Sequence, residues 1–257
     1  MRPGEAISAA LRARAGSEPA LVAFLMAGHP NPNRFVELIS AVSTVAAAIE
    51  IGVPHCDPVA DGPVIRRASR QALAAGVTLE RVLQQLAELA LPPQPPLVLM
   101  SYRVPLLAFG SAHLASALRS AGVAGLLVPD QLPEEEQRMR SALEAEELAL
   151  VQLVTPLLPP AELARRADVA RGFVYAATSG GVTGSERQVD TDLHAYLDQI
   201  RALTDLPVCA GFGIRNAAQV AALAGHADGV VVGSALIEAI AGGQDPAAFL
   251  RGLRAPA

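Results

Sequence analysis

AAAIEIG (46–52), which runs into the loop VPHCDPVADGP (53–63), is one of eight short apolar runs that decide the fold of this chain. Each run is nearly continuously apolar, which is typical of a parallel strand buried on both faces. The other seven runs are LVAFLMAG (21–28), PLVLMSY (96–102), GLLVPD (125–130), LALVQLV (148–154), GFVYAAT (172–178), PVCAGF (207–212) and DGVVVGS (228–234).

Amphipathic segments separate most of these runs and are predicted to form helices. Eight strands, nearly all followed by a helix, in about 250 residues predict a (β/α)8 barrel, with a doubly wound parallel sheet as the main alternative. The units continue to the C-terminus without a linker or a change in composition, so we expect one α/β domain, a single TIM barrel over residues 1–257. The expected helices are 34–45, 78–90, 111–122, 160–170, 191–203, 216–225 and 245–255.

The composition excludes several classes of function. The 257 residues carry a formal net charge of −5, which disfavours binding to nucleic acid. All 20 basic residues are arginine. Without lysine there is no Schiff-base aldolase, no internal aldimine with pyridoxal phosphate and no Walker A nucleotide site.

The chain shows no pattern of a metal site, a secreted protein or a membrane protein. Cys56 and Cys209 are far apart, and no metal-ligand spacing links them to the five histidines, so we predict no metal and no disulfide. The N-terminus is charged, and no apolar stretch approaches the ~20 residues that cross a membrane. We therefore expect a cytoplasmic protein with no membrane contact.

Glu50 lies inside an otherwise apolar run, where a carboxylate without a partner is unusual. One interpretation pairs it with an arginine from another strand. The other places it in the barrel mouth for proton transfer. Asp57 and Asp61 follow among prolines and a glycine, which is also typical of a turn. Because the chemistry of such barrels lies at the C-terminal ends of the strands, we predict that Glu50 and Asp61 flank one substrate.

Glycine-containing loops follow three successive predicted strands, at SGGVTG (179–184), GFGI (211–214) and VGSA (232–235). Glycine lets backbone N–H groups approach an anion, and a helix beginning there adds its positive end. Each loop alone is also explained by a tight turn, but together they predict a phosphate on a small substrate. GFGIRN (211–216) lacks the third glycine of a dinucleotide site. EEEQRMR (134–140) is interpreted as a solvated first helical turn.

At these positions the sequence resembles the α subunit of tryptophan synthase. EIGVPHCDPVADGP (50–63) is similar to the family signature ElGiPFSDPxADGP, and the similarity covers about residues 20–240. The other similar segments are AGHP (27–30), GVAGLLVPD (122–130), GFVYAATSGGVTG (172–184), PVCAGFGI (207–214) and ADGVVVGSA (227–235).

The resemblance implies retro-aldol cleavage of indole-3-glycerol phosphate to indole and glyceraldehyde 3-phosphate in tryptophan biosynthesis, without a metal or an organic cofactor. Glu50 matches the family's catalytic glutamate, and Asp61 matches the aspartate that binds the indole N–H. Tyr175, Leu99 and Phe212 are expected to line the indole pocket. The expected phosphate contacts are Gly184, Gly213, Gly233 and Ser234.

The resemblance also implies a partner, the β subunit of an α2β2 tetramer. In the family this subunit faces the loops after strands two and three and the segment after VPD (128–130). The chain departs from the family on those surfaces, although it keeps Asp57, which matches an aspartate of inter-subunit communication. We hypothesise that the chemistry is retained while the coupling is altered; ordinary drift is the alternative. The departing residues are His55, Cys56, Val104 and Leu132.

Three functions remain open at this point. The chain is an ordinary α subunit, a stand-alone indole-3-glycerol phosphate lyase that releases free indole, or a non-catalytic activator of a β subunit. The retained Glu50 and Asp61 count against the non-catalytic activator.

Overall fold

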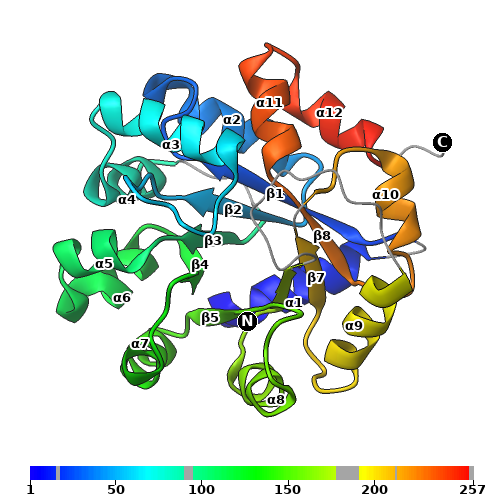
Figure 1. Cartoon of the computed structure of the whole chain (residues 1–257). Coiled ribbons are helices and arrows are strands. Elements are labelled where there is room, and N and C mark those ends of the chain that lie inside the picture. Colours follow the sequence, from blue (N-terminus) through cyan, green and yellow to red (C-terminus); the bar gives the residue numbers. More distant parts are fainter. Residues whose placement is uncertain (16–17, 90–94, 178–190, 212, 255–257) are drawn as a thin grey trace.

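Eight parallel strands close into a barrel in chain order, with β8 paired to β1 (Figure 1). This computed structural model describes every residue except 16–17, 90–94, 178–190, 212 and 255–257. The predicted (β/α)8 barrel is confirmed, and the doubly wound sheet is excluded. The strands are β1 (Ala20–Met26), β2 (Ala48–Gly52), β3 (Leu97–Met100), β4 (Val123–Leu127), β5 (Ala149–Val154), β6 (Val174–Ala177), β7 (Val208–Gly211) and β8 (Gly229–Val232).

Helices surround the barrel, and each predicted helical segment contains one of them. Five α-helices, α1, α3, α5, α7 and α11, fall outside those segments. No helix among the described residues is long and apolar enough to cross a membrane. The helices are α1 (Pro3–Arg14), η1 (Pro32–Arg34), α2 (Phe35–Ser43), α3 (Pro63–Ala74), α4 (Leu79–Ala87), α5 (Arg103–Phe109), α6 (Ser111–Ser120), α7 (Pro133–Ala145), α8 (Pro160–Val169), α9 (Thr191–Arg201), α10 (Ala217–Ala222), α11 (Ser234–Ala241) and α12 (Pro246–Gly252).

The strands divide their side chains between two apolar layers. In β1, Leu21 and Leu25 pack in the layer shared with the outer helices, whereas Val22 and Phe24 belong to the interior of the barrel. This alternation follows from the two-residue period of a strand. It decides which residue of each strand reaches the inside, and therefore which residues are available to a site at the barrel mouth.

Helix α1 fills the N-terminal end of the barrel. Its Ile7 and Leu11 are fully buried and belong to the interior layer, together with Phe173 from the entry of β6. The helix packs against β1 and β4. Since side chains occupy this end, the space for a ligand lies at the other end, where the strands terminate.

Candidate active site

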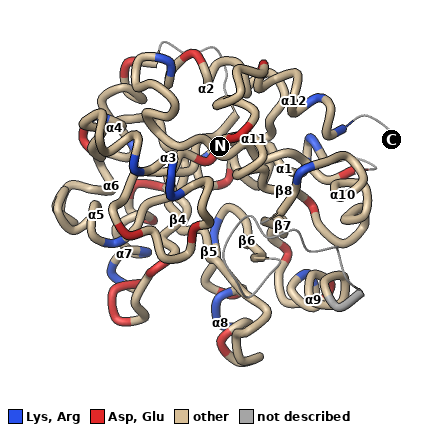
Figure 2. The backbone as a smooth tube through the Cα atoms, turned by 45° about the horizontal axis from the view of Figure 1, so that its top comes forward, with Lys and Arg blue, Asp and Glu red and all other residues tan. Residues whose placement is uncertain are grey.

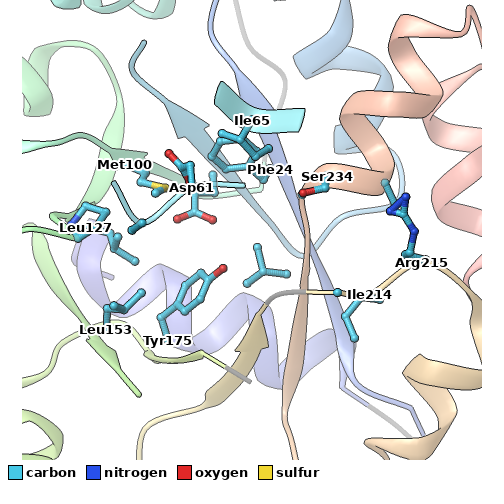
Figure 3. Close-up of a pocket in the computed structure, with 17 residues that line it drawn as sticks. Phe24, Asp61, Ile65, Met100, Leu127, Leu153, Tyr175, Ile214, Arg215 and Ser234 are labelled. Atoms are coloured by element: carbon cyan, nitrogen blue, oxygen red, sulfur yellow. The ribbon is translucent and has the colours of Figure 1, made fainter. Parts of the chain in front are cut away.

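A pocket opens at the C-terminal ends of the strands (Figure 3). Its wall is mostly apolar, with a few polar groups converging on it. This mixture is typical of a site for a small molecule with an apolar part. The apolar lining includes Phe24, Ile65, Met100, Leu127, Leu153, Ile214 and Val231.

Glu50 lies on the interior face of β2, between Ile49 and Ile51, which pack toward the helices. It lines the pocket and is 1% exposed, and its Oε1 atom has no hydrogen-bond partner among the described residues. Burial, reinforced by the negative charge of Asp61, raises the pKa of Glu50 to about 8. No arginine pairs with Glu50 in the described part of the chain, which favours proton transfer over the structural ion pair.

Asp61 reaches the same pocket from the loop between β2 and α3, and it is 5% exposed. Tyr102 donates a hydrogen bond from its hydroxyl to Oδ2 of Asp61, at 3.1 Å. Burial raises the pKa of Asp61 to about 6, while this hydrogen bond and the charge of Arg66 oppose the rise. The structure therefore brings the two predicted carboxylates together, in surroundings that separate their pKa values.

Tyr102, two residues after β3 and the N-cap of α5, is a site residue that the sequence pattern did not predict. Its hydroxyl accepts a hydrogen bond from the backbone N–H of Ala60 at 3.1 Å while it donates to Asp61, so it ties the catalytic loop to the neighbouring strand. The ring of His55 stacks on its ring, with centroids 5.1 Å apart. The tyrosine ends one of the predicted strands, which was the available signal.

The structure describes three of the four predicted phosphate contacts. Gly213, Gly233 and Ser234 line the pocket, and α11 begins at Ser234 with Gly233 as its N-cap. Gly213 has a φ of 84°, which favours glycine. The first backbone N–H groups of a helix lack intrahelical partners and suit an anion. Gly184, with the rest of SGGVTG (179–184), and Phe212 lie outside the described residues.

Tyr175 lines the pocket from β6 and is 7% exposed, as predicted for a pocket residue. Burial raises the pKa of its phenol well above the ordinary value, so the ring stays neutral. A Cβ added at Gly211 would lie 2.3 Å from the Oη and Cζ atoms of Tyr175. The first glycine of GFGI therefore makes room for this ring.

Leu99 does not line the pocket, so that prediction is wrong. It is fully buried in the layer between the barrel and the helices, together with Leu97. The next residue, Met100, lines the pocket instead. The reason is the strand period: in β3, Val98 and Met100 point inward, and Leu97 and Leu99 point outward.

Three of the four residues that depart from the family pattern lie together. His55, Cys56 and Val104 line a single groove beside α3, α4 and α5. Leu132, the N-cap of α7, is 36% exposed after β4. No group of three or more metal-ligating side chains occurs among the described residues, and the absence of a metal stays a prediction.

These features define a class of protein before any comparison. A (β/α)8 barrel with two desolvated carboxylates, an apolar pocket and a glycine-lined helix N-terminus is an enzyme fold built for acid–base chemistry on a small substrate. The comparisons narrow this class. A family model described as tryptophan synthase alpha chain matches residues 11–252. The chain belongs to this family, as its motifs predict.

Relatives and solved structures agree with this assignment. The tryptophan synthase alpha chain of Laribacter hongkongensis is 44% identical over 248 residues, which is 94% of each chain. A chain of M. tuberculosis tryptophan synthase, in an aminoacrylate-bound form, superposes with a TM-score of 0.86 at 33% identity, covering 97% of this chain and 98% of that one. A mutant tryptophan synthase alpha-subunit of Pyrococcus furiosus gives 0.84 at 29% identity, covering 92% and 98%.

Proposed function

We propose that this chain catalyses the reaction of its family, the cleavage of indole-3-glycerol phosphate to indole and glyceraldehyde 3-phosphate in tryptophan biosynthesis. The proposal assigns the proton transfers to Glu50 and the stabilisation of the indole ring to Asp61. The observation that carries these roles is the position of Glu50, a buried carboxylate without an arginine partner in the described chain, beside Asp61 in an apolar pocket.

The first step is protonation of indole C3, because an aromatic carbon is a poor leaving group until it is tautomerised. With a pKa of about 8, Glu50 carries a proton at neutral pH and donates it to C3. Positive charge then develops on the indole nitrogen. With a pKa of about 6, Asp61 is mostly ionised at neutral pH, and its carboxylate accepts the N–H and stabilises that charge.

The second step breaks the carbon–carbon bond. The Glu50 carboxylate removes the proton from the hydroxyl on the carbon attached to C3. The O–H electron pair becomes the C=O bond of the aldehyde, and the electron pair of the breaking bond returns to the ring. Neutral indole and glyceraldehyde 3-phosphate result, and Glu50 is again protonated, so the cycle balances without a cofactor.

The substrate phosphate is assigned to the side of the pocket where Gly213, Gly233 and the first turn of α11 lie, with Gly184 as a further predicted contact. Valine at position 213 places a branched side chain where the phosphate must sit, so Gly213→Val should weaken affinity for glycerol 3-phosphate at least about tenfold. Gly225→Val is the matched control, because Gly225 has nearly the same φ, 83°, but lies away from the pocket. Equal affinity in the two variants would place the phosphate elsewhere.

We also propose that a tryptophan synthase β subunit docks on the rim of the barrel mouth, in an α2β2 assembly. Apolar side chains follow β2, β3 and β4 there with exposed fractions between 36% and 58%, and large exposed apolar residues in a group are typical of an interface. The grouping of three departing residues in one groove supports a joint change of that contact over independent drift. The exposed residues are Val59, Val104, Leu107 and Leu132.

The experiment is the rate of indole release from indole-3-glycerol phosphate by the purified chain, with and without a bacterial tryptophan synthase β subunit. A slow rate that the partner raises strongly supports the chemistry and the docking, and it would mean that the departing residues are drift. A fast rate indifferent to the partner supports the chemistry but rejects the coupling, and identifies a stand-alone lyase. No indole in either condition rejects the proposed function.

A further inference from the structure

Arg215 is the only arginine that lines the pocket within the described residues. It follows Gly213 and Ile214 in the loop after β7. Figure 3 shows it on the same side of the pocket as Ser234, across from Leu127 and Leu153. The sequence pattern predicts a phosphate role for the glycines of this loop and none for the arginine.

The backbone of Arg215 is held in place. Its N–H donates to Oε1 of Gln219 at 2.7 Å, and the Gln219 N–H in turn donates to Oδ1 of Asn216, the N-cap of α10, at 3.0 Å. The start of the side chain is therefore fixed relative to the glycines of the phosphate side.

Within the described residues, the guanidinium itself has a single, exchangeable partner. Arg215 Nη2 lies 2.6 Å from Oε2 of Glu238, and the two side chains are 35% and 40% exposed. An ion pair this exposed contributes little to stability, so a stronger anion displaces the carboxylate at little cost. Glu238 lies one helical turn after Ser234 on α11. The ion pair with Glu238 therefore holds the guanidinium beside the helix that begins at the pocket.

The other charges of the pocket show why the positive charge of Arg215 matters for binding a phosphate. The ionised carboxylate of Asp61, which also lines the pocket, repels a phosphate dianion, and glycine N–H groups supply only partial positive charge. A guanidinium matches phosphate in shape, because its fork donates two parallel hydrogen bonds.

We propose that Arg215 is a phosphate-recognition residue: when a phosphorylated substrate binds, its guanidinium leaves Glu238 and pairs with the phosphate held near Gly213, Gly233 and Ser234. This inference rests on the proposed function, since it assumes that the phosphate occupies that side of the pocket. The phosphate lies away from the reacting bond, so the contact has equal strength in the ground state and the transition state. It therefore lowers KM without changing kcat.

The test compares three variants with the wild-type chain. Arg215→Gln removes the charge, Glu238→Gln removes its resting partner, and Arg34→Gln is the matched control. Arg34 forms a similarly short and exposed pair with Glu37, at 2.9 Å, outside the pocket. The first measurement is the dissociation constant for glycerol 3-phosphate, by titration calorimetry or ³¹P NMR, which needs no turnover. The second is kcat and KM with indole-3-glycerol phosphate.

The proposal predicts that Arg215→Gln weakens the binding of glycerol 3-phosphate and raises KM, each about tenfold, with kcat within about twofold. Glu238→Gln tightens binding two- to threefold, because the guanidinium no longer has to leave a carboxylate, and Arg34→Gln changes nothing. Added salt weakens binding more in the wild type than in Arg215→Gln.

Unchanged affinity in Arg215→Gln, while the wild type binds glycerol 3-phosphate, overturns the role of Arg215 and leaves the proposed function standing. Equal loss with Arg34→Gln also overturns it, because the effect would then be one of net charge. Failure of the wild type to release indole rejects the proposed function, and the phosphate titration still decides the role of Arg215 as an anion-binding residue.

Discussion

Glu50 and Glu136 are both buried glutamates, with exposed fractions of 1% and 5%. They differ in their surroundings, because an arginine bonds to Glu136 and none bonds to Glu50 in the described chain. Glu136, on α7, receives hydrogen bonds from Arg165 Nη1 at 2.9 Å and Nη2 at 3.0 Å. Glu50 has no such partner in the described chain, and its pKa is raised to about 8. The carboxylate of Glu136 is bonded to an arginine and joins two helices, whereas Glu50 holds its proton and has it to give.

The region around Glu136 shows the structural solution in full. Arg165 also pairs with Glu162 on its own helix, and hydrogen bonds from Arg165 and Arg166 hold the pKa of Glu162 down to about 2. Figure 2 shows the basic and acidic segments side by side on α7 and α8, at the outside of the barrel. Burial alone therefore does not mark a catalytic carboxylate; burial without a cation does.

We expect the largest difference between Glu50→Gln and Glu136→Gln in the turnover number, kcat. Glu50→Gln should lower kcat by about 10²–10⁴-fold while the affinity for glycerol 3-phosphate stays nearly unchanged, because the amide cannot transfer the proton. Glu136→Gln should leave kcat within about twofold. Steady-state kinetics of indole release measures both, and substantial turnover in Glu50→Gln would remove its catalytic role.

The same two variants should shift stability in opposite directions. Glu136→Gln leaves Arg165 without its partner and should lower the free energy of unfolding by about 1–2 kcal/mol, a value reduced because Arg165 is 39% exposed. Glu50 holds its proton more tightly in the folded state than in the unfolded state. The wild type therefore loses stability as pH rises from about 4.5 toward 8, and Glu50→Gln does not.

Urea unfolding at pH 5 and pH 8 measures these differences. We expect Glu50→Gln to gain stability relative to wild type between the two pH values. A wild-type curve that does not fall relative to Glu50→Gln over this range would mean that the Glu50 carboxyl titrates at its ordinary pKa.

The sequence identified Glu50 as a buried carboxylate and missed Glu136. Glu50 stands out because its neighbours in the chain are apolar. Glu136 sits in EEEQRMR (134–140), which was interpreted as solvated. That interpretation is wrong for Glu136, because its partner Arg165 is 29 residues further along and on another helix. A local pattern cannot reveal a pair of that kind.

The fold was predictable to a greater extent than the site. Eight apolar runs predict eight strands. Helix α3 was not predicted, because it begins at Pro63, directly after Asp61, where the proline and glycine residues are typical of a turn. Matching Leu99 to a family position missed the inward residue by one position. Sequence similarity alone does not show which face of the strand a side chain is on. Tyr102 touches Asp61 only after β2 and β3 pair, a contact that no local pattern contains.

A smaller effect sharpens the difference between the two carboxylates of the pocket. Tyr102 lowers the pKa of Asp61 by donating to its ionised form, so Tyr102→Phe should raise that pKa. The acid limb of kcat/KM, which reports ionised Asp61, should move from about pH 6 to higher pH by about half a unit to one unit, while the alkaline limb near 8 stays. A pH–rate profile with an unmoved acid limb would reject this role of Tyr102.

The central claim is that Glu50 is protonated in the folded protein at neutral pH. The direct measurement is a ¹³C NMR titration of the chain labelled at the glutamate carboxyl carbons. The signal that disappears in Glu50→Gln belongs to Glu50, and the one that disappears in Glu136→Gln belongs to the arginine-paired Glu136, which serves for comparison. The account predicts that the Glu50 signal titrates with a midpoint near 8. A midpoint near the ordinary value of 4.5 would mean that Glu50 is a carboxylate at neutral pH, which would contradict its role as the proton donor.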